Sequence, residues 1–267
     1  MNVNGVSSNN ASILEQLNKK QDTVFEQLAS GKKVNKSADA AAAQQIIDRL
    51  TAESNAYQQS SRNAYDGISL SQVADGALQG INEDAQRIRE LTLQSGSGIL
   101  TDADRQAIQS EISGLQQNIQ DTINNTEFNG QALFNQDNEF SFQVGSGAGQ
   151  KTSVNTSDLA SQLSGLQNID VTNGSDLTSS LESLDSALSF IGSERGELGA
   201  QQNAFASIIN NLSTTNVNVQ AAQSRLQDTD YAQAASAQAQ NDVLTQSSTA
   251  VAAQARQNQQ QVLNLLS

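Results

Sequence analysis

Residues 177–226 read LTSSLESLDSALSFIGSERGELGAQQNAFASIINNLSTTNVNVQAAQSRL. Along this stretch one set of positions recurs in alternating steps of four and three residues, and all but four of its members are apolar. The set is Leu177, Leu181, Leu184, Leu188, Ile191, Arg195, Leu198, Gln202, Phe205, Ile209, Leu212, Asn216, Val219, Gln223 and Leu226. A repeat of 3.5 residues held over this length predicts a long helix that lies against another helix.

The first half of the chain supplies the partner helices. Residues from about 38 to 95 read as one long helix, with Asp39 as its expected N-cap. Three glycines in its interior, Gly67, Gly76 and Gly80, indicate either close packing of another helix or simple tolerance, because each weakens a helix. The apolar positions expected on its face are Ile46, Leu50, Tyr57, Ala64, Ile68, Val73, Leu78, Ile81, Ala85 and Ile88.

A second, shorter helix is predicted after the break at residues 95–98 (SGSG). It begins at Thr101 or Asp102, has Asp104 in its first turn and runs to about Asn125. Its apolar positions are Ile108, Ile112, Leu115 and Ile119. The two halves of the chain are therefore expected to pack together as one rod, and such rods are usually parts of assemblies.

In a small insert at about 136–176, the spacing of the apolar residues changes from a helical to a strand-like pattern. Phe140, Phe142 and Val144 alternate with polar residues, which predicts a strand, and the glycine-rich run 145–149 predicts a turn. Further short strands are expected around Thr152 and Val154, and around Ile169 and Val171. The pairs Asn129–Gly130 and Asn173–Gly174 are turn signals.

The two ends of the chain carry only thin apolar stripes. Residues 1–40 have a weak helical period that stops at Gly31, and residues 231–267 form an amphipathic pattern of modest strength. Neither is strong enough to predict a stable isolated helix. Each end is therefore expected to need a partner that covers its stripe, and residues 1–40 are expected to be disordered in the monomer.

Composition narrows the function classes. The chain has no Pro, Cys, His or Trp, which suits long helices and excludes thiolate nucleophiles, His-based dyads and Cys/His zinc sites. The net charge of −14 argues against nucleic acid or anionic lipid as a partner. No apolar run is long enough for a membrane span, and residues 1–12 lack the features of a secretory signal. Neither an enzyme nor a cofactor or metal site is expected.

Seven segments of the chain resemble, in order, the motifs of bacterial flagellins. They are residues 28–35 (LASGKKVN), 63–72 (NAYDGISLSQ), 86–95 (QRIRELTLQS), 128–130 (FNG), 195–205 (RGELGAQQNAF), 222–231 (AQSRLQDTDY) and 262–266 (VLNLL). The chain departs from the family pattern at residues 39–43, where a "DDAAG" segment is usual, and at Gln259, where a Pro is usual. The family's variable outer domains are missing, which implies a thin, smooth filament.

The resemblance implies a structural subunit that polymerises into the flagellar filament for swimming motility. The implied fold is mainly α: an antiparallel coiled-coil rod at 41–230 with a small β-hairpin insert, and terminal segments 1–40 and 231–267 that form a helical coiled coil between subunits. The protein would be extracellular, exported without a cleaved signal peptide. Its implied partners are other flagellin subunits, the flagellin export chaperone, and the cap and hook-associated proteins.

Two sets of residues are candidate sites under this resemblance. The filament-core set is Leu14, Leu17, Leu28, Val243, Leu244, Val251, Val262, Leu263, Leu265 and Leu266, of which Val243, Leu244, Val262 and Leu263 would also fill the chaperone's grooves. The second set, matched to the family's receptor-recognition motif, is Gln86, Arg87, Leu91 and Glu111. It implies binding by the flagellin-sensing Toll-like receptor, although filament contacts alone would also explain these residues.

Other interpretations remain at this point. A hook–filament junction protein shares the two-ended helical plan, and the segments 63–72 and 262–266 favour a flagellin over it. A translocator with coiled-coil ends would need an apolar membrane-inserting stretch. The carboxylates of Asp228 and Asp230 could suggest acid–base or metal chemistry, but such a pair without His is more often a helix cap or solvated.

Overall fold

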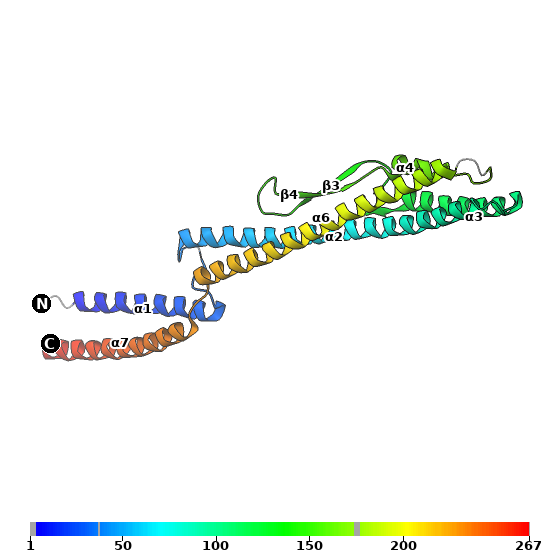
Figure 1. Cartoon of the computed structure of the whole chain (residues 1–267). Helices are drawn as coiled ribbons and strands as arrows, with labels where there is room; N and C mark the ends of the chain where they lie inside the picture. The colour runs from blue at the N-terminus through cyan, green and yellow to red at the C-terminus, as the bar shows by residue number, and fades with distance from the viewer. Residues whose placement is uncertain (1–3, 37, 174–176, 267) are drawn as a thin grey trace. The chain divides into compact units, whose positions relative to one another are not determined.

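The structure is mainly helical, as predicted. The computed structural model describes residues 4–36, 38–173 and 177–266, with side chains for residues 12–36, 38–173, 177–258, 260 and 261. The elements in chain order are α1 (Asn4–Ser30), α2 (Ala41–Ser95), α3 (Asp102–Asn125), β1 (Glu127–Phe128), β2 (Gln131–Ala132), β3 (Asn138–Gln143), β4 (Lys151–Thr156), α4 (Leu159–Gln162), α5 (Ser164–Gln167), α6 (Leu177–Gln227) and α7 (Tyr231–Leu266) (Figure 1).

The chain forms two compact units. The terminal unit consists of Met1–Ser54 and Val217–Ser267, and the central unit is Asn55–Asn216. The long helices α2 and α6 contribute to both units. The division at 40 and 230 made from the sequence coincides with the starts of α2 and α7, and as a domain division it stays a prediction.

Helix α6 confirms the 3.5-residue repeat. It spans the whole predicted stretch, and its repeat positions within the central unit are all buried or half-buried. Leu184, Ile191, Leu198 and Phe205 are fully enclosed. Two ion pairs join α6 to α2 within this unit: Arg195 Nε lies 2.8 Å from Asp75 Oδ1, and Arg89 Nε lies 2.8 Å from Asp185 Oδ1. The polar Arg195 in the repeat is thus matched by a carboxylate on the partner helix.

The buried face of α2 differs in part from the expected one. Leu78, Ile81, Ala85 and Ile88 are fully buried as predicted, whereas Ile46 and Val73 are exposed. The face continues instead through small residues, namely Ala64, Gly67, Ser71, Ala74, Thr92 and Ser95. The hydroxyl groups on this face are satisfied locally, because such side chains donate to the carbonyl of the preceding turn, as Ser71 does to Gly67.

One of the three α2 glycines allows a close helix approach. A Cβ atom on Gly67 would lie 2.6 Å from the Phe205 ring of α6, so the hydrogen-only side chain is needed at that point. A Cβ on Gly76 or Gly80 would meet nothing within 4 Å. The close-packing interpretation is therefore confirmed for Gly67, and Gly76 and Gly80 have no such neighbour within the chain.

Helix α3 begins as its sequence predicts. Thr101 is its N-cap, and Thr101 and Asp104 form a reciprocal capping box. The hydroxyl and backbone N–H of Thr101 both donate to the Asp104 carboxylate and hold its pKa below the usual value. The buried residues of α3 are Ile108, Ile112, Ile119 and Ile123, and they complete a three-helix core with α2 and α6.

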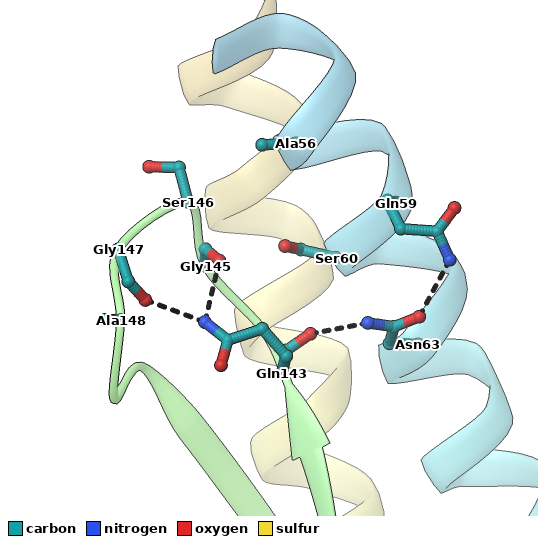
Figure 2. A pocket seen from close by; sticks show the side chains of 9 residues that line it. All are labelled: Ala56, Gln59, Ser60, Asn63, Gln143, Gly145, Ser146, Gly147 and Ala148. Carbon is teal, nitrogen blue, oxygen red and sulfur yellow. Dashed lines mark hydrogen bonds between the residues drawn. The ribbon is translucent and has the colours of Figure 1, made fainter. Parts of the chain in front are cut away.

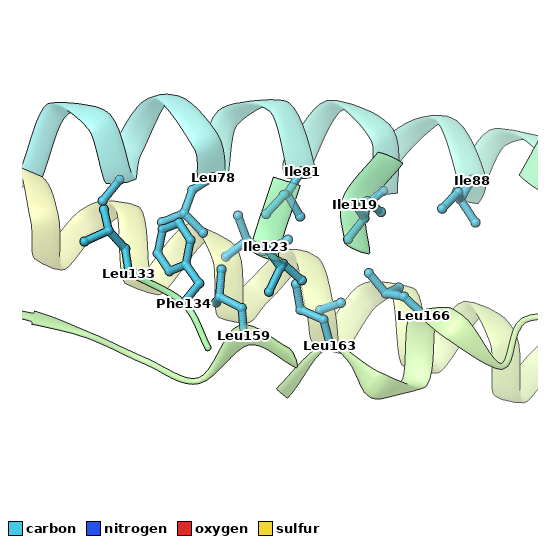
Figure 3. Close-up of a cluster of buried hydrophobic side chains, with 14 of the residues drawn as sticks. Leu78, Ile81, Ile88, Ile119, Ile123, Leu133, Phe134, Leu159, Leu163 and Leu166 are labelled. Carbon is cyan, nitrogen blue, oxygen red and sulfur yellow. The ribbon is translucent and has the colours of Figure 1, made fainter. Parts of the chain in front are cut away.

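Two hairpins follow α3. Strands β1 and β2 are joined by Asn129 and Gly130, whose φ angles of 52° and 76° give the left-handed turn that the Asn–Gly pair predicts. Strands β3 and β4 pair antiparallel from Asn138↔Thr156 to Gln143↔Lys151. Both predicted strands of the insert are thereby confirmed. Figure 3 shows how Leu133, Phe134 and Leu159 meet Leu78 and Ile81 of α2 in the core.

The predicted strands at Ile169 and Val171 are wrong. The chain forms the short helices α4 and α5 and then a loop in which both residues are buried. Their backbone is satisfied by side chains: Gln109 of α3 donates to Ile169 O at 3.2 Å and accepts from Val171 N at 2.8 Å. Gln116 of α3 also donates to Ile169 O, at 3.3 Å. Two glutamine side chains therefore replace the strand partner that the sequence pattern implied. Of the turn signal at Asn173–Gly174, Gly174 lies outside the described residues.

In the terminal unit, α1 and α7 lie side by side (Figure 1). Gly31 ends α1 with a φ of 69°, as its position predicted. The backbone then runs beside the end of α6 and the start of α7, with hydrogen bonds from Lys33 N to Gln227 O (2.6 Å) and from Thr229 N to Gly31 O (3.0 Å). These bonds join the end of α1 to the start of α7.

The predicted role of Asp39 is wrong. Helix α2 begins at Ala41, and the Asp39 carboxylate accepts hydrogen bonds from the backbone N–H groups of Lys36 and Asn35, upstream of the helix. These bonds lower the pKa of Asp39. The residue therefore stabilises the loop between α1 and α2 and was mistaken for a cap because both roles place a carboxylate just before a helix.

Candidate assembly surface

The face that α1 turns to α7 is apolar. Leu14, Leu17, Val24 and Leu28 are half-buried and recur in steps that keep them on one side of α1. Gln21 lies in the same row, and its Nε2 donates to Asp242 Oδ1 of α7 at 2.6 Å. Three of the predicted filament-core residues, Leu14, Leu17 and Leu28, thus lie in the contact between the two terminal helices of one chain.

The face that α7 turns to α1 is small and polar. Most of its buried and half-buried positions follow the 3.5-residue repeat, namely Ala234, Gln238, Asn241, Thr245, Ser248, Ala252 and Ala255, and Ala237 and Asp242 beside them are also half-buried. Such residues bury little apolar surface, and burial of apolar surface is the main source of stability. Within the described residues, Gln238 Oε1 and Thr245 Oγ1 are buried there without a hydrogen-bond partner. The pairing of α1 with α7 is therefore weakly stabilised within the chain.

The larger apolar residues of α7 point away from α1. Val243, Leu244 and Val251 are 66%, 50% and 58% exposed. Val243 and Leu244 line a shallow groove together with Ser236, Ala239 and Gln240. We call Val243, Leu244 and Val251 the outer face of α7. Exposed apolar residues grouped along one helix face are typical of a surface that another protein covers.

Helix α1 also has exposed apolar residues outside the predicted filament-core set, namely Phe25 and Ile13. Ile13 belongs to the weak helical period of the sequence, whereas Phe25 falls outside that period and a search for a single stripe missed it. The remaining predicted core residues, Val262, Leu263, Leu265 and Leu266, belong to α7, but their side chains lie outside the described set.

The residues matched to the receptor motif lie in the central unit. Arg87 of α2 forms ion pairs with Glu111 of α3 at 2.8 Å and with Glu90 at 3.1 Å. Gln86, Arg87 and Glu111 are all exposed, so the three share an accessible polar surface across α2 and α3.

Leu91, the fourth member of that set, is placed differently. Its side chain is 2% exposed and belongs to the buried core. In the folded central unit it therefore supports the surface formed by Gln86, Arg87 and Glu111 from beneath. A change at Leu91 would act on packing before it acted on any surface contact.

The structure gives Asp230 a cap role. Its Oδ1 accepts from the backbone N–H groups of Ala232 and Gln233 at 3.0 and 3.1 Å, at the start of α7. The carboxylate of Asp228 accepts from the hydroxyl of Ser224.

Across the described ranges, no three His, Cys, Asp or Glu side chains are grouped so as to hold a metal ion. No described helix combines the length and apolarity that a membrane crossing requires.

Comparison with known families identifies the chain. Residues 1–139 match the bacterial flagellin N-terminal helical region, and residues 181–266 match the bacterial flagellin C-terminal helical region. The two matches cover most of the sequence and both of its ends. The chain belongs to the bacterial flagellin family. The seven motifs identified in the sequence all lie within these two regions.

Individual relatives agree with this assignment. The flagellin of Bacillus subtilis (strain 168) is 35% identical over 99% of this chain and 96% of its own length. Among solved structures, Bacillus cereus flagellin matches with a TM-score of 0.51 and 25% identity, over 57% of this chain and 88% of that one. A putative flagellar hook-associated protein from Vibrio parahaemolyticus has a TM-score of 0.61 at 16% identity, over 71% of this chain and 100% of that one.

The flagellin family fixes the function. The chain is a structural protein, not an enzyme, and it polymerises with other flagellin subunits into the extracellular flagellar filament. With 267 residues, and only residues 140–180 between the two matched regions, this is a short flagellin without a large middle insert. The likeness to the hook-associated protein shows a shared fold alone, so the junction-protein alternative has no support beyond that fold.

Proposed function

We propose that the outer face of α7, together with Phe25 and Ile13 of α1, is the surface through which the terminal helices contact neighbouring subunits in the filament. The observation that carries this proposal is the orientation of α7. Its small polar residues face α1, and Val243, Leu244 and Val251 face outward. The apolar side chains are thus directed to a partner that the single chain does not supply.

Magnitudes support this assignment. Full burial of a Val or Leu side chain that starts fully exposed contributes about 1.5–3 kcal/mol. Because Val243, Leu244 and Val251 are already partly covered, the outer face of α7 could contribute on the order of 3–5 kcal/mol per subunit. Ordering one residue costs about 1–2 kcal/mol in backbone entropy, so this gain offsets the ordering of only a few residues. The outer face is therefore one contributor to assembly, beside the other contacts of the terminal helices.

On the same grounds, we expect the terminal helices to become stably ordered only when the subunit assembles. The contact between α1 and α7 buries few large apolar residues on the α7 side, so we expect these helices to open readily in the monomer. Hydrogen exchange should then be fast for residues 4–30 and 231–266 in monomers and slow in filaments. Equal protection of these segments and of the central unit in monomers would contradict this proposal.

The assembly test substitutes one outer-face residue. Leu244→Gln keeps a helix-forming side chain but removes the apolar contact, and it should raise the critical concentration for seeded polymerisation about tenfold or more. Gln246→Ala is the matched control, because Gln246 is also exposed but lies on the opposite side of α7. An unchanged critical concentration for Leu244→Gln, with monomer helicity intact, would sink the proposal.

We propose the other partners on narrower grounds. Before assembly, the exposed Val243 and Leu244, with Val262 and Leu263, would occupy the hydrophobic grooves of the flagellin export chaperone. A truncation ending at Tyr231 should then fail to copurify with the chaperone. At the filament ends, the cap and hook-associated proteins would contact the same terminal helices in place of a further subunit.

Recognition by the flagellin-sensing Toll-like receptor remains a proposal for Gln86, Arg87 and Glu111, with Leu91 beneath them. The supporting observation is their shared exposed surface across α2 and α3. Arg87→Ala should reduce receptor signalling by the monomer and leave the thermal unfolding of the central unit nearly unchanged, since exposed ion pairs contribute little stability. Gln79→Ala, at another exposed α2 position, is the control. Unchanged signalling by Arg87→Ala would leave only the filament-contact interpretation.

A further inference from the structure

We infer that the loop between α2 and α3 inserts Ile99 into a cavity between α2 and the β3–β4 turn of a second copy of this chain. This contact is separate from the outer face of α7, because both of its sides lie in the central unit. It would join subunits head to tail, and a head-to-tail contact that does not close on itself produces an open filament.

The first side of the contact is a fixed apolar projection. Ile99 is 91% exposed, and Leu93, which is also exposed, lies close to it in the chain. The loop is held on both sides of Ile99. Before it, Ser97 N donates to Gln94 O at 3.1 Å; after it, Leu100 packs against the core and the Thr101–Asp104 capping box starts α3. Because its neighbours are anchored, Ile99 is presented to solvent on a rigid support.

The second side is a shallow pocket of about 330 Å³, open to solvent, at the other end of the central unit (Figure 2); this pocket is the cavity named above. Its α2 wall comes from Ala56, Gln59, Ser60 and Asn63, and its opposite wall is the turn from Gly145 to Ala148 with Gln143. A volume near the lower limit for ligand pockets suits one or two side chains. The small residues of the turn leave room for a branched apolar group.

The turn that forms this wall is well ordered. Gln143 Nε2 donates to Gly145 O at 2.9 Å and to Gly147 O at 2.7 Å. Asn63 Nδ2 of α2 donates to Gln143 O at 2.9 Å and ties the hairpin to the helix. The cavity is therefore preformed, so a partner that enters it does not bear the entropy cost of ordering the turn.

Ser60 places a hydroxyl group on the α2 wall of the cavity. Its side chain lies on the α2 wall with the hydroxyl directed toward the turn (Figure 2). The residue is only 3% exposed, and no hydrogen bond joins its hydroxyl to any group among the described residues. The hydroxyl is open to the pocket and is not among the buried side-chain atoms that lack a partner, so water can satisfy it in the monomer. The backbone amides around Gly98 and Ile99 would arrive with the inserted loop and could take the place of that water.

The two sides cannot meet within one molecule. Helix α2 is continuous from Ala41 to Ser95. Ser60 and Ser95 are therefore separated by about 50 Å along one helix, at 1.5 Å per residue. Since the same chain cannot fold the loop back onto the cavity, Ile99 can reach it only in a second copy.

Charges near the two sides are complementary. Asp102 and Asp104 follow Ile99 and are exposed. Arg62 is held beside the cavity by its hydrogen bonds to Gln59 Oε1 at 2.7 and 3.1 Å, and Lys151 follows the turn. Neither Arg62 nor Lys151 has a carboxylate partner among the described residues. Two carboxylates on one copy would thus approach two cations on the next.

Cysteine crosslinking tests the contact directly, because the full chain contains no Cys. A double variant with Ile99→Cys and Ala148→Cys should, after polymerisation and mild oxidation or a short bis-maleimide, give a ladder of covalent multimers. A mixture of the two single variants should stop at dimers, since each chain then carries half of the contact. The control pair, Ile99→Cys with Gln79→Cys, should give no ladder. The inference would be overturned if filaments of the double variant gave no ladder, or if filaments of the mixed single variants gave no covalent dimer.

A second measurement does not depend on crosslinking. Ile99→Asp should raise the critical concentration for polymerisation at least about tenfold, whereas Ile99→Val should have a small effect. Helicity of both monomers should equal that of the parent chain, because Ile99 makes no core contact. Normal polymerisation of Ile99→Asp would likewise overturn the inference. Since these variants leave the outer face of α7 intact, their outcome is independent of the outcome for Leu244→Gln.

Discussion

Gly67→Ala gives a sharp test of the close approach between α2 and α6. In the structure a Cβ atom on Gly67 would lie 2.6 Å from Cζ, 2.8 Å from Cε1 and 2.9 Å from Cε2 of Phe205. The ring would have to move by about 1 Å to restore normal contact distances. That movement is opposed, since Phe205 is fully buried and packs edge-on against Phe142, with ring centroids 5.7 Å apart.

Two opposite effects determine how much Gly67→Ala changes the free energy of unfolding. Overpacking of a core costs about 1–3 kcal/mol, and Gly to Ala within a helix contributes about 1 kcal/mol of stability. We therefore expect Gly67→Ala to lower the free energy of unfolding by roughly 0–2 kcal/mol. At Gly76 a Cβ meets nothing within 4 Å, so Gly76→Ala should raise the free energy of unfolding by about 1 kcal/mol.

Urea unfolding of the monomers, followed by far-ultraviolet circular dichroism, compares the two variants. The decisive quantity is the difference in free energy of unfolding between the two variants. The gain in helix propensity from Gly to Ala is common to both variants and cancels in this difference. A Phe205→Leu background should reduce the cost of Gly67→Ala, since the smaller side chain leaves room for the new methyl group. The reasoning is refuted if Gly67→Ala stabilises the chain as much as Gly76→Ala does.

Three further predictions concern single hydrogen-bonding and charged groups. Gln109→Ala should cost about 1–3 kcal/mol and speed exchange of the Val171 N–H, because it leaves that backbone N–H unpaired; normal exchange at Val171 would contradict it. Thr101→Ala should cost about 1 kcal/mol, with a smaller loss in acid. The depressed pKa of Asp104 means that the stability from its cap bonds is present above its unfolded pKa and lost as pH falls through the folded value. Burial raises the pKa of Glu194, so its ionised form opposes folding at neutral pH and Glu194→Gln should stabilise the chain there, with the gain vanishing in acid.

Much of the fold was available from the sequence, because helix signals are local. The 3.5-residue repeat of residues 177–226 gave α6 almost to the residue, and the Thr101–Asp104 pair gave the start of α3. The Asn129–Gly130 turn followed from the tolerance of these two residues for positive φ. Each signal lies within a few residues of the feature it predicts.

The errors arose where distant residues decided the outcome. Ile169 and Val171 have the composition of a strand, but Gln109, about 60 residues earlier, and Gln116 provide their backbone partners. Val73 fits an apolar stripe but is exposed, because the approach of α6 fixes which side of α2 is buried. No pattern within either segment carries this information.

For the candidate surfaces too, the sequence identified residues by type and the structure decided where they lie. The sequence selected Val243, Leu244 and Val251 from their apolar character, and the structure showed that they face away from α1. It also selected Leu91 from a motif, and the structure placed that residue in the core. The cavity beside Ser60 had no sequence signal, since it is formed by two segments about 80 residues apart.

The sequence by itself determined the helical class, the small hairpin insert and the membership of the flagellin family, because periodicity, turn residues and ordered motifs are properties of short segments. Tertiary structure alone decided which face of each helix is buried, that Gly67 accommodates Phe205, and where a cavity and an exposed Ile99 lie. The physical reason is that burial is set by the packing of segments distant in the chain, and a residue type does not specify what will lie against it.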